Sequence, residues 1–118
     1  MTIEDFTEDK YVKGAHDSIV KKVVSRLEDS GLYDCVKHNV KYYLPNTKQY
    51  GEADVLAKAG ERYFAFEIKS SHRGKNKAIQ QLRKDSRLLE WEGMNTQPYL
   101  YRVYGSKGNS VYERIKYI

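Results

Sequence analysis

The chain has 118 residues, of which 40% are hydrophobic and 31% are charged, and its formal net charge is +5. This composition excludes an intrinsically disordered chain, and this length suits one domain with its own hydrophobic core. No apolar run approaches the roughly 20 residues of a membrane span. A single cysteine, Cys35, excludes an intrachain disulfide and a cysteine-based metal site within one chain. The acidic start of the chain is unlike a signal peptide, so we expect one soluble domain over residues 1–118 that stays inside the cell.

The apolar pattern predicts two helices and five strands. Ile19, Val20, Val23, Val24 and Leu27 recur at helical spacing, and several later segments alternate as strands do. The predicted elements, in chain order, are an irregular or loosely helical lead-in over 1–12, a helix over 15–29, a strand over 33–44, a loop over 45–50, hairpin strands over 52–57 and 62–70, a basic loop over 71–76, a helix over 77–91, and strands over 98–104 and 111–118 separated by a turn.

This order of elements predicts an α/β fold. The passage from residue 62 to residue 104 is strand, helix, strand, which favours a parallel pair joined by a crossover helix. A central mixed sheet flanked by helices is the natural way to bury the apolar faces of these elements.

Polar side chains interrupt two of the most apolar strands. Asp54 lies within Ala53–Leu56, and Glu67 and Lys69 lie in the run that contains Phe66 and Ile68. Because strand side chains alternate between faces, Glu67 and Lys69 point the same way. A buried carboxylate is costly unless it is paired or bound to a metal. Two carboxylates and an ammonium beside a hairpin could therefore hold a divalent ion and activate a water, although a strand-end aspartate and a Glu67–Lys69 ion pair also explain them.

The pattern Asp54 followed by Glu67-x-Lys69 resembles the PD-(D/E)XK nuclease superfamily. Within it, the layout from about Lys13 to about Tyr104 is most like the small archaeal-type Holliday-junction resolvases and related viral nucleases. The resemblance implies a restriction-endonuclease-like mixed sheet flanked by helices and a DNA endonuclease that depends on Mg²⁺ or Mn²⁺. The acidic start of the chain and the single cysteine predict a cytoplasmic location, in the host cytoplasm if the protein is viral. Ala53 departs from the pattern, which often has proline before the aspartate.

The resemblance also implies roles for particular side chains. Asp54 and Glu67 would bind metal, and Lys69 would position or deprotonate the attacking water. Asp17 of the first helix is the candidate for a third ligand, although an aspartate in a first helical turn also meets the helix dipole favourably. Gln81 is preferred to Gln80 as a contact to the lysine or the phosphate, with a solvated helix face as the alternative. Glu52 is equally an outer contact or a solvated residue, and the neighbouring His16 is expected to be structural or exposed.

Basic residues follow the Glu67-x-Lys69 strand and favour an anionic partner, for which DNA is the usual candidate. The residues expected to contact DNA are Ser70, Ser71, Arg73, Lys75, Lys77, Arg83 and Lys84. Eleven tyrosines are unusual for this length; those in strands can stack on bases but more often pack. A homodimer is possible, because symmetric cutting of two strands needs two sites.

Two other functions remain open. One is a non-catalytic nucleic-acid-binding protein that keeps the same fold, which the intact Asp54, Glu67 and Lys69 set argues against. The other is a structural or protein-interaction domain that uses the tyrosine-rich strands as an interface. The sequence specifies neither the DNA structure that would be cut nor the number of metal ions.

Overall fold

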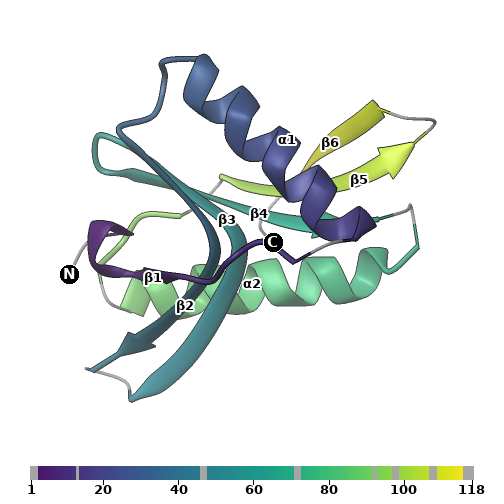
Figure 1. Ribbon diagram of the computed structural model, residues 1–118. Coiled ribbons are helices and arrows are strands. Elements are labelled where there is room, and N and C mark those ends of the chain that lie inside the picture. The colour runs from purple at the N-terminus through teal and green to yellow at the C-terminus, as the bar shows by residue number, and fades with distance from the viewer. Residues whose placement is uncertain are drawn as a thin grey trace.

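The computed structural model describes residues 3–12, 14–45, 48–70, 73–91, 93–96, 99–106 and 109–115. Two helices and six strands follow a short 3-10 turn within these ranges, arranged as shown in Figure 1. In chain order they are η1 (Ile3–Asp5), β1 (Thr7–Glu8), α1 (Ala15–Asp29), β2 (Cys35–Leu44), β3 (Gln49–Ala59), β4 (Arg62–Lys69), α2 (Lys75–Trp91), β5 (Leu100–Ser106) and β6 (Asn109–Ile115).

The strands form one mixed sheet in which spatial order follows chain order, from β1 to β6. Neighbouring strands are antiparallel except β4 and β5, which are parallel and pair from Ala65↔Leu100 to Lys69↔Tyr104. The chain between these two strands contains α2, because parallel neighbours cannot be joined by a tight turn. The prediction of an α/β domain with a crossover helix between residues 62 and 104 is therefore confirmed.

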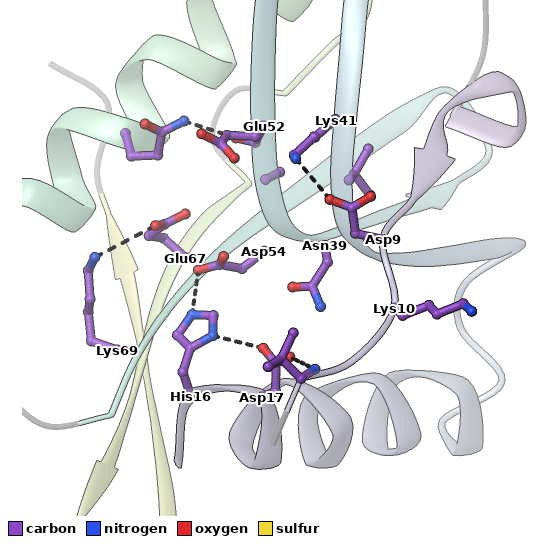
Figure 2. Close-up of a pocket in the computed structure, with 14 residues that line it drawn as sticks. Asp9, Lys10, His16, Asp17, Asn39, Lys41, Glu52, Asp54, Glu67 and Lys69 are labelled. Carbon is purple, nitrogen blue, oxygen red and sulfur yellow. Dashed lines mark hydrogen bonds and ion pairs between the residues drawn. The ribbon is translucent and has the colours of Figure 1, made fainter. Parts of the chain in front are cut away.

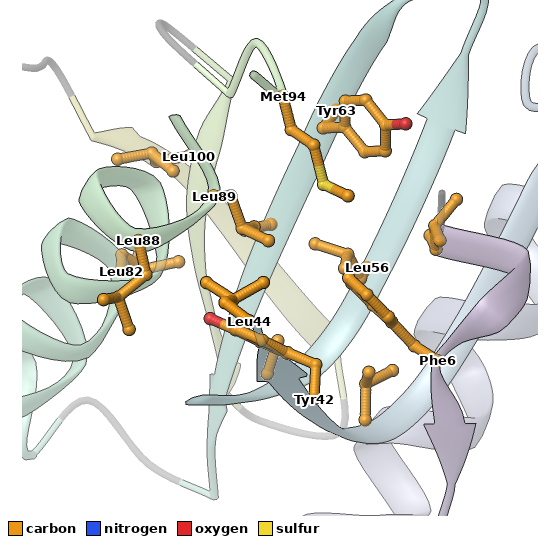
Figure 3. Close-up of a cluster of buried hydrophobic side chains, with 14 of the residues drawn as sticks. Phe6, Tyr42, Leu44, Leu56, Tyr63, Leu82, Leu88, Leu89, Met94 and Leu100 are labelled. Carbon is orange, nitrogen blue, oxygen red and sulfur yellow. The ribbon is translucent and has the colours of Figure 1, made fainter. Parts of the chain in front are cut away.

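Each helix covers one face of the sheet with its own hydrophobic cluster (Figure 1). The valines of α1 and Leu27 pack with Val55, Phe66 and Val103. The leucines of α2 pack on the other face with Leu56, which Figure 3 shows between α2 and the N-terminal segment. Adjacent residues such as Val55 and Leu56 enter different clusters because strand side chains alternate.

This alternation shifts midway along the β2–β3 hairpin. On β2, Val36 packs against the α1 cluster, whereas Val40 lies in the α2 cluster although both are even-numbered. The same shift separates Ala53 from Val55 on β3. Between them, the pairing runs from His38↔Val55 to Val40↔Ala53 and omits Asn39, whose φ is 47°. Asn39 tolerates this left-handed conformation better than most residues, so a local distortion lies directly opposite Asp54.

The N-terminal lead-in is more ordered than the sequence suggests. Thr7 and Glu8 form β1, which pairs with Lys41 and Val40 at the edge of β2. The 3-10 turn η1 agrees with the predicted irregular or loosely helical lead-in, but the prediction is wrong at Thr7 and Glu8, because a two-residue edge strand has too few residues for alternation to be seen. The chain then passes from β1 to α1, which covers the opposite end of the same hairpin (Figure 1).

The remaining boundaries differ from the predictions by a few residues. The first helix begins and ends as predicted. The β2–β3 hairpin is longer than predicted, because β3 begins at Gln49 rather than Glu52 and pairs with the end of β2. The second helix begins at Lys75 rather than Lys77, after the left-handed Gly74. Within the described residues, no helix is long and apolar enough to cross a membrane.

Candidate active site

A cavity of about 410 Å³ opens where β3 separates from β4. The β3–β4 ladder begins at Val55↔Phe66, and the preceding residues of β3 pair with β2 instead. This divergence leaves room for side chains from α1, β2, β3, β4 and α2 (Figure 2). The polar lining residues include His16 and Asp17 of α1, Glu52 and Asp54 of β3, Glu67 and Lys69 of β4, and Gln81 of α2.

Asp54 lies at this divergence. Its Oδ2 accepts a hydrogen bond from the backbone N–H of Ile68 at 2.8 Å, and this bond continues the contact between β3 and β4 past the last ladder pair. The same oxygen lies 3.3 Å from Nε2 of His16. One carboxylate therefore joins β3, β4 and α1. The side chain of Asp54 is 20% exposed.

Glu67 is buried on β4 beside Asp54, and only 8% of the residue is exposed. Burial raises the pKa of Glu67 strongly, and the negative charges of Asp54 and Asp85 raise it further. The ammonium of Lys69 acts in the opposite direction, but Nζ lies 3.9 Å from Oε1 of Glu67 and remains partly exposed. Burial and the neighbouring carboxylates therefore outweigh Lys69 in setting the pKa of Glu67.

Lys69 ends β4 on the same face as Glu67, as predicted from strand alternation. Its aliphatic stem passes beside Gly74, where an added Cβ would lie 3.6 Å from Cδ of the lysine. Lys69 lines the cavity, and its ammonium points toward Glu67 (Figure 2).

Asp17 and His16 bring α1 into the site. Asp17 Oδ2 accepts a hydrogen bond from the backbone N–H of Val12, and Oδ1 lies 3.1 Å from Nδ1 of His16. The Val12 N–H and then His16 hold the pKa of Asp17 below its usual value. For His16, burial acts to lower the pKa, but Asp17 and Asp54 together raise it above its usual value.

His16 thus bridges the first-helix carboxylate and the β3 carboxylate (Figure 2). The sequence-based expectation that it would be structural or exposed did not include this position in the cavity. The available signal was its place directly before Asp17 in the first helical turn.

Gln81 reaches the cavity from α2, and Gln80 is exposed, as the choice between them predicted. Its Nε2 donates to the backbone carbonyl of Glu52 at 2.9 Å, and it lies 3.3 Å from Oδ1 of Asp85. This amide therefore satisfies the edge of β3 where β4 has diverged. The described hydrogen bonds of Gln81 do not include one to Lys69.

Asp85 is a site neighbour that the sequence analysis missed. It is fully buried, and its Oδ1 accepts a hydrogen bond from the hydroxyl of Tyr42 at 2.6 Å. Its Oδ2 has no hydrogen-bond partner among the described residues. Burial raises the pKa of Asp85 to about 8 against the opposing effect of Tyr42 and Gln81. The signal was its spacing, since Asp85 lies three residues after Leu82 and four before Leu89 on the buried stripe of α2.

The residues predicted to contact DNA are spread more widely. Lys84 lines a second cavity next to the site. Lys75 forms an ion pair with Glu113 of β6 at 3.5 Å. Ser71 lies outside the described residues, and the others are exposed but do not line the site cavity: Ser70, Arg73, Lys77 and Arg83.

Within the part of the chain that the structure describes, no group of three or more His, Cys, Asp and Glu side chains is arranged closely enough to hold a metal ion. Comparison with models of protein families, with curated protein sequences and with solved structures finds no match.

Proposed function

We propose that this protein is a metal-dependent endonuclease that hydrolyses phosphodiester bonds in DNA, with a restriction-endonuclease-like fold of the PD-(D/E)XK kind. The observation that carries the proposal is the meeting of Asp54, Glu67 and Lys69 in one cavity where β3 and β4 diverge. The order of elements agrees with it: a helix, three antiparallel strands, a crossover helix and a parallel strand.

The donor set fits a hard divalent cation. Mg²⁺ and Mn²⁺ prefer carboxylate oxygens and water, and Asp17, Asp54 and Glu67 bring carboxylates from three elements to the cavity. The raised pKa of Glu67 supports the fit, because a cation beside it would supply the positive charge that Lys69 only partly provides. Small rotations of Asp17 and Asp54 away from His16 would free oxygens for binding.

The bound cation and the side chains of the protein would have different roles in the reaction. When bound, Mg²⁺ or Mn²⁺ would stabilise negative charge on the phosphate and make water a stronger nucleophile at neutral pH. Lys69 would position the attacking water, or accept its proton where the amine is neutral, and as an ammonium it would stabilise the charge that develops on the phosphate oxygens. Gln81 holds the edge of β3 in place, so that Asp54 faces Glu67 across the cavity. Branched or junction DNA is one candidate substrate by resemblance, and symmetric cutting of its two strands needs two sites, which a homodimer would provide.

A non-catalytic nucleic-acid-binding protein with the same fold is the second candidate. The observation that favours it is the lack, among described residues, of a preassembled group of three metal-ligating side chains. His16 also occupies the space between two of the proposed ligands. Such a protein would bind DNA through its excess positive charge and would not need Glu67 to ionise.

Cleavage of labelled DNA separates the two candidates. We would compare duplex, single-stranded and four-way-junction DNA in Mg²⁺, Mn²⁺ and EDTA, using wild type, Glu67→Ala and Lys69→Ala. The nuclease is supported if cutting requires metal and is lost in both variants. A matched control is Lys22→Ala, which removes an exposed lysine of α1 that lies outside the cavity and outside the predicted DNA-contact set, and it should keep activity. Binding without cutting under every condition would favour the non-catalytic protein.

A further inference from the structure

The β2–β3 hairpin carries two tyrosines that pack against no core. Tyr43 and Tyr50 are directly opposite in the ladder, with ring centroids 4.7 Å apart. Their exposed fractions are 43% and 73%, whereas the adjacent Tyr42 is 4% exposed. The sequence-based preference for packing therefore holds for Tyr42 but not for this pair. The two exposed rings are tilted by 41° to each other and together form an apolar surface.

This surface is continuous with the candidate active site. A cavity of about 280 Å³ is lined by Lys41, Tyr50, Gly51, Glu52 and Lys84. Lys41 and Glu52 also line the larger site cavity, so the two cavities share a wall. Tyr50 is four residues before Asp54 on β3, a separation of about 13 Å along an extended strand. A few nucleotides of an extended chain would cover this separation.

Lysines accompany the aromatic rings. Lys84 of α2 is exposed and lines the smaller cavity. Lys48, the residue before β3, is also exposed. Lys41 lies between the two cavities, where Asp9 partly offsets its charge at 3.0 Å. Proteins hold single-stranded nucleic acid with two kinds of side chain. Cationic groups lie along the phosphate backbone, and aromatic rings stack on the bases.

We propose that Tyr43 and Tyr50 stack on unpaired bases of a single-stranded DNA segment whose backbone continues along Lys41 and Lys84 into the active-site cavity. Bases in an intact duplex are stacked on each other, so their faces are not available to a tyrosine at the surface. A single-stranded segment exposes both the bases and the backbone at once. The inference deepens the proposed function, because it names an unpaired segment next to the cut bond as the feature of the substrate that is recognised.

Binding in EDTA tests the inference without requiring cleavage. The probes are a fluorescein-labelled single-stranded oligothymidylate and a labelled duplex of the same length, measured by fluorescence anisotropy. We expect Tyr50→Ala to weaken single-strand binding by about five- to a hundredfold and to leave duplex binding nearly unchanged. Tyr50→Phe, which keeps the ring, should bind as wild type does. Leu32→Ala is the control for removal of an exposed apolar side chain elsewhere, since Leu32 is 72% exposed.

Three outcomes would overturn the inference. Single-strand binding that is unchanged in Tyr43→Ala and Tyr50→Ala would show that the rings contact no base. Equal weakening of single-strand and duplex binding would remove the preference for unpaired bases. A shift from dimer to monomer in sedimentation, with DNA binding unchanged, would show that the surface joins two copies of the chain. Circular dichroism melting of each variant confirms that the fold is intact.

The same variants separate this inference from the nuclease proposal. Tyrosine-dependent binding of single strands without metal-dependent cutting would support the inference while refuting the nuclease. The opposite result is metal-dependent cutting that is lost in Glu67→Ala, with single-strand binding and cutting unchanged in Tyr43→Ala and Tyr50→Ala. It would support the nuclease proposal and refute the inference.

Discussion

Replacement of Asp85 by asparagine should stabilise the protein at neutral pH. Asp85 is fully buried, with one oxygen that accepts hydrogen bonds and one that has no described partner. Asparagine keeps nearly the same shape, and its carbonyl oxygen can still accept from Tyr42 and Gln81. The substitution therefore removes the cost of protonating this carboxyl group, which the wild type bears to avoid burying a negative charge, and it opens no cavity.

The size of the effect follows from the difference between the folded and unfolded carboxyl groups. The pKa of Asp85 is raised from its usual 3.8 to about 8 in the folded protein. Between these values the folded state holds a proton that the unfolded state releases, so stability falls as pH rises, by about 1.4 kcal/mol per pH unit. At pH 7, which is 3.2 units above 3.8, wild type has lost about 4 kcal/mol relative to Asp85→Asn.

Urea unfolding of both proteins between pH 4 and pH 8 measures this difference. The free energies of unfolding should nearly coincide at pH 4 and diverge steadily as pH rises, with the variant more stable. A loss of about 4 kcal/mol is a large share of the 5–15 kcal/mol that stabilises a typical domain, so urea unfolding can measure the divergence easily. Asp29→Asn, which makes the same chemical change at an exposed position at the end of α1, is the matched control for a buried carboxyl group.

A difference between wild type and Asp85→Asn that stays constant from pH 4 to pH 8 would refute the reasoning. It would mean that Asp85 ionises at the same pH in both states, and hence that water or a cation reaches Oδ2 in solution. A variant that is less stable at every pH would show that the anionic form accepts hydrogen bonds that asparagine cannot replace.

Three further predictions concern the hairpin, the N-terminal segment and DNA binding. Gly51→Ala should destabilise the fold by at least about 1–3 kcal/mol in thermal melting, because the added Cβ would lie 2.2 Å from the ring of Tyr42; an unchanged melting temperature would contradict this. In Asp17→Asn the Val12 amide proton should exchange faster with solvent, because its acceptor is altered. Wild type should lose stability as pH falls below about 4, through the lowered pKa of Asp17, and Asp17→Asn should lack this loss. If DNA binds through phosphate contacts, the logarithm of the binding constant should fall linearly with the logarithm of salt concentration, and Lys84→Ala should reduce the slope by about 1; a slope near zero would exclude such contacts.

Local sequence patterns determined most of the elements of this fold. The apolar spacing that specifies α1 and the alternation that specifies β4 act within a few residues of each other, so they are visible in the sequence. The same alternation placed Glu67 and Lys69 on one face, and the crossover between β4 and β5 followed from the intervening helix. Element ends were less accurate, because glycine conformation and strand pairing decide them.

Only the tertiary structure decided how the site is assembled. The divergence of β3 from β4, the distortion at Asn39, and the approach of α1 are long-range events with no local pattern. They bring His16 between Asp17 and Asp54 and place buried Asp85 near Glu67, which spacing along the chain does not reveal. Exposure of Tyr43 and Tyr50 was likewise hidden, because alternation shows that adjacent tyrosines face opposite ways but not which face the rest of the protein covers.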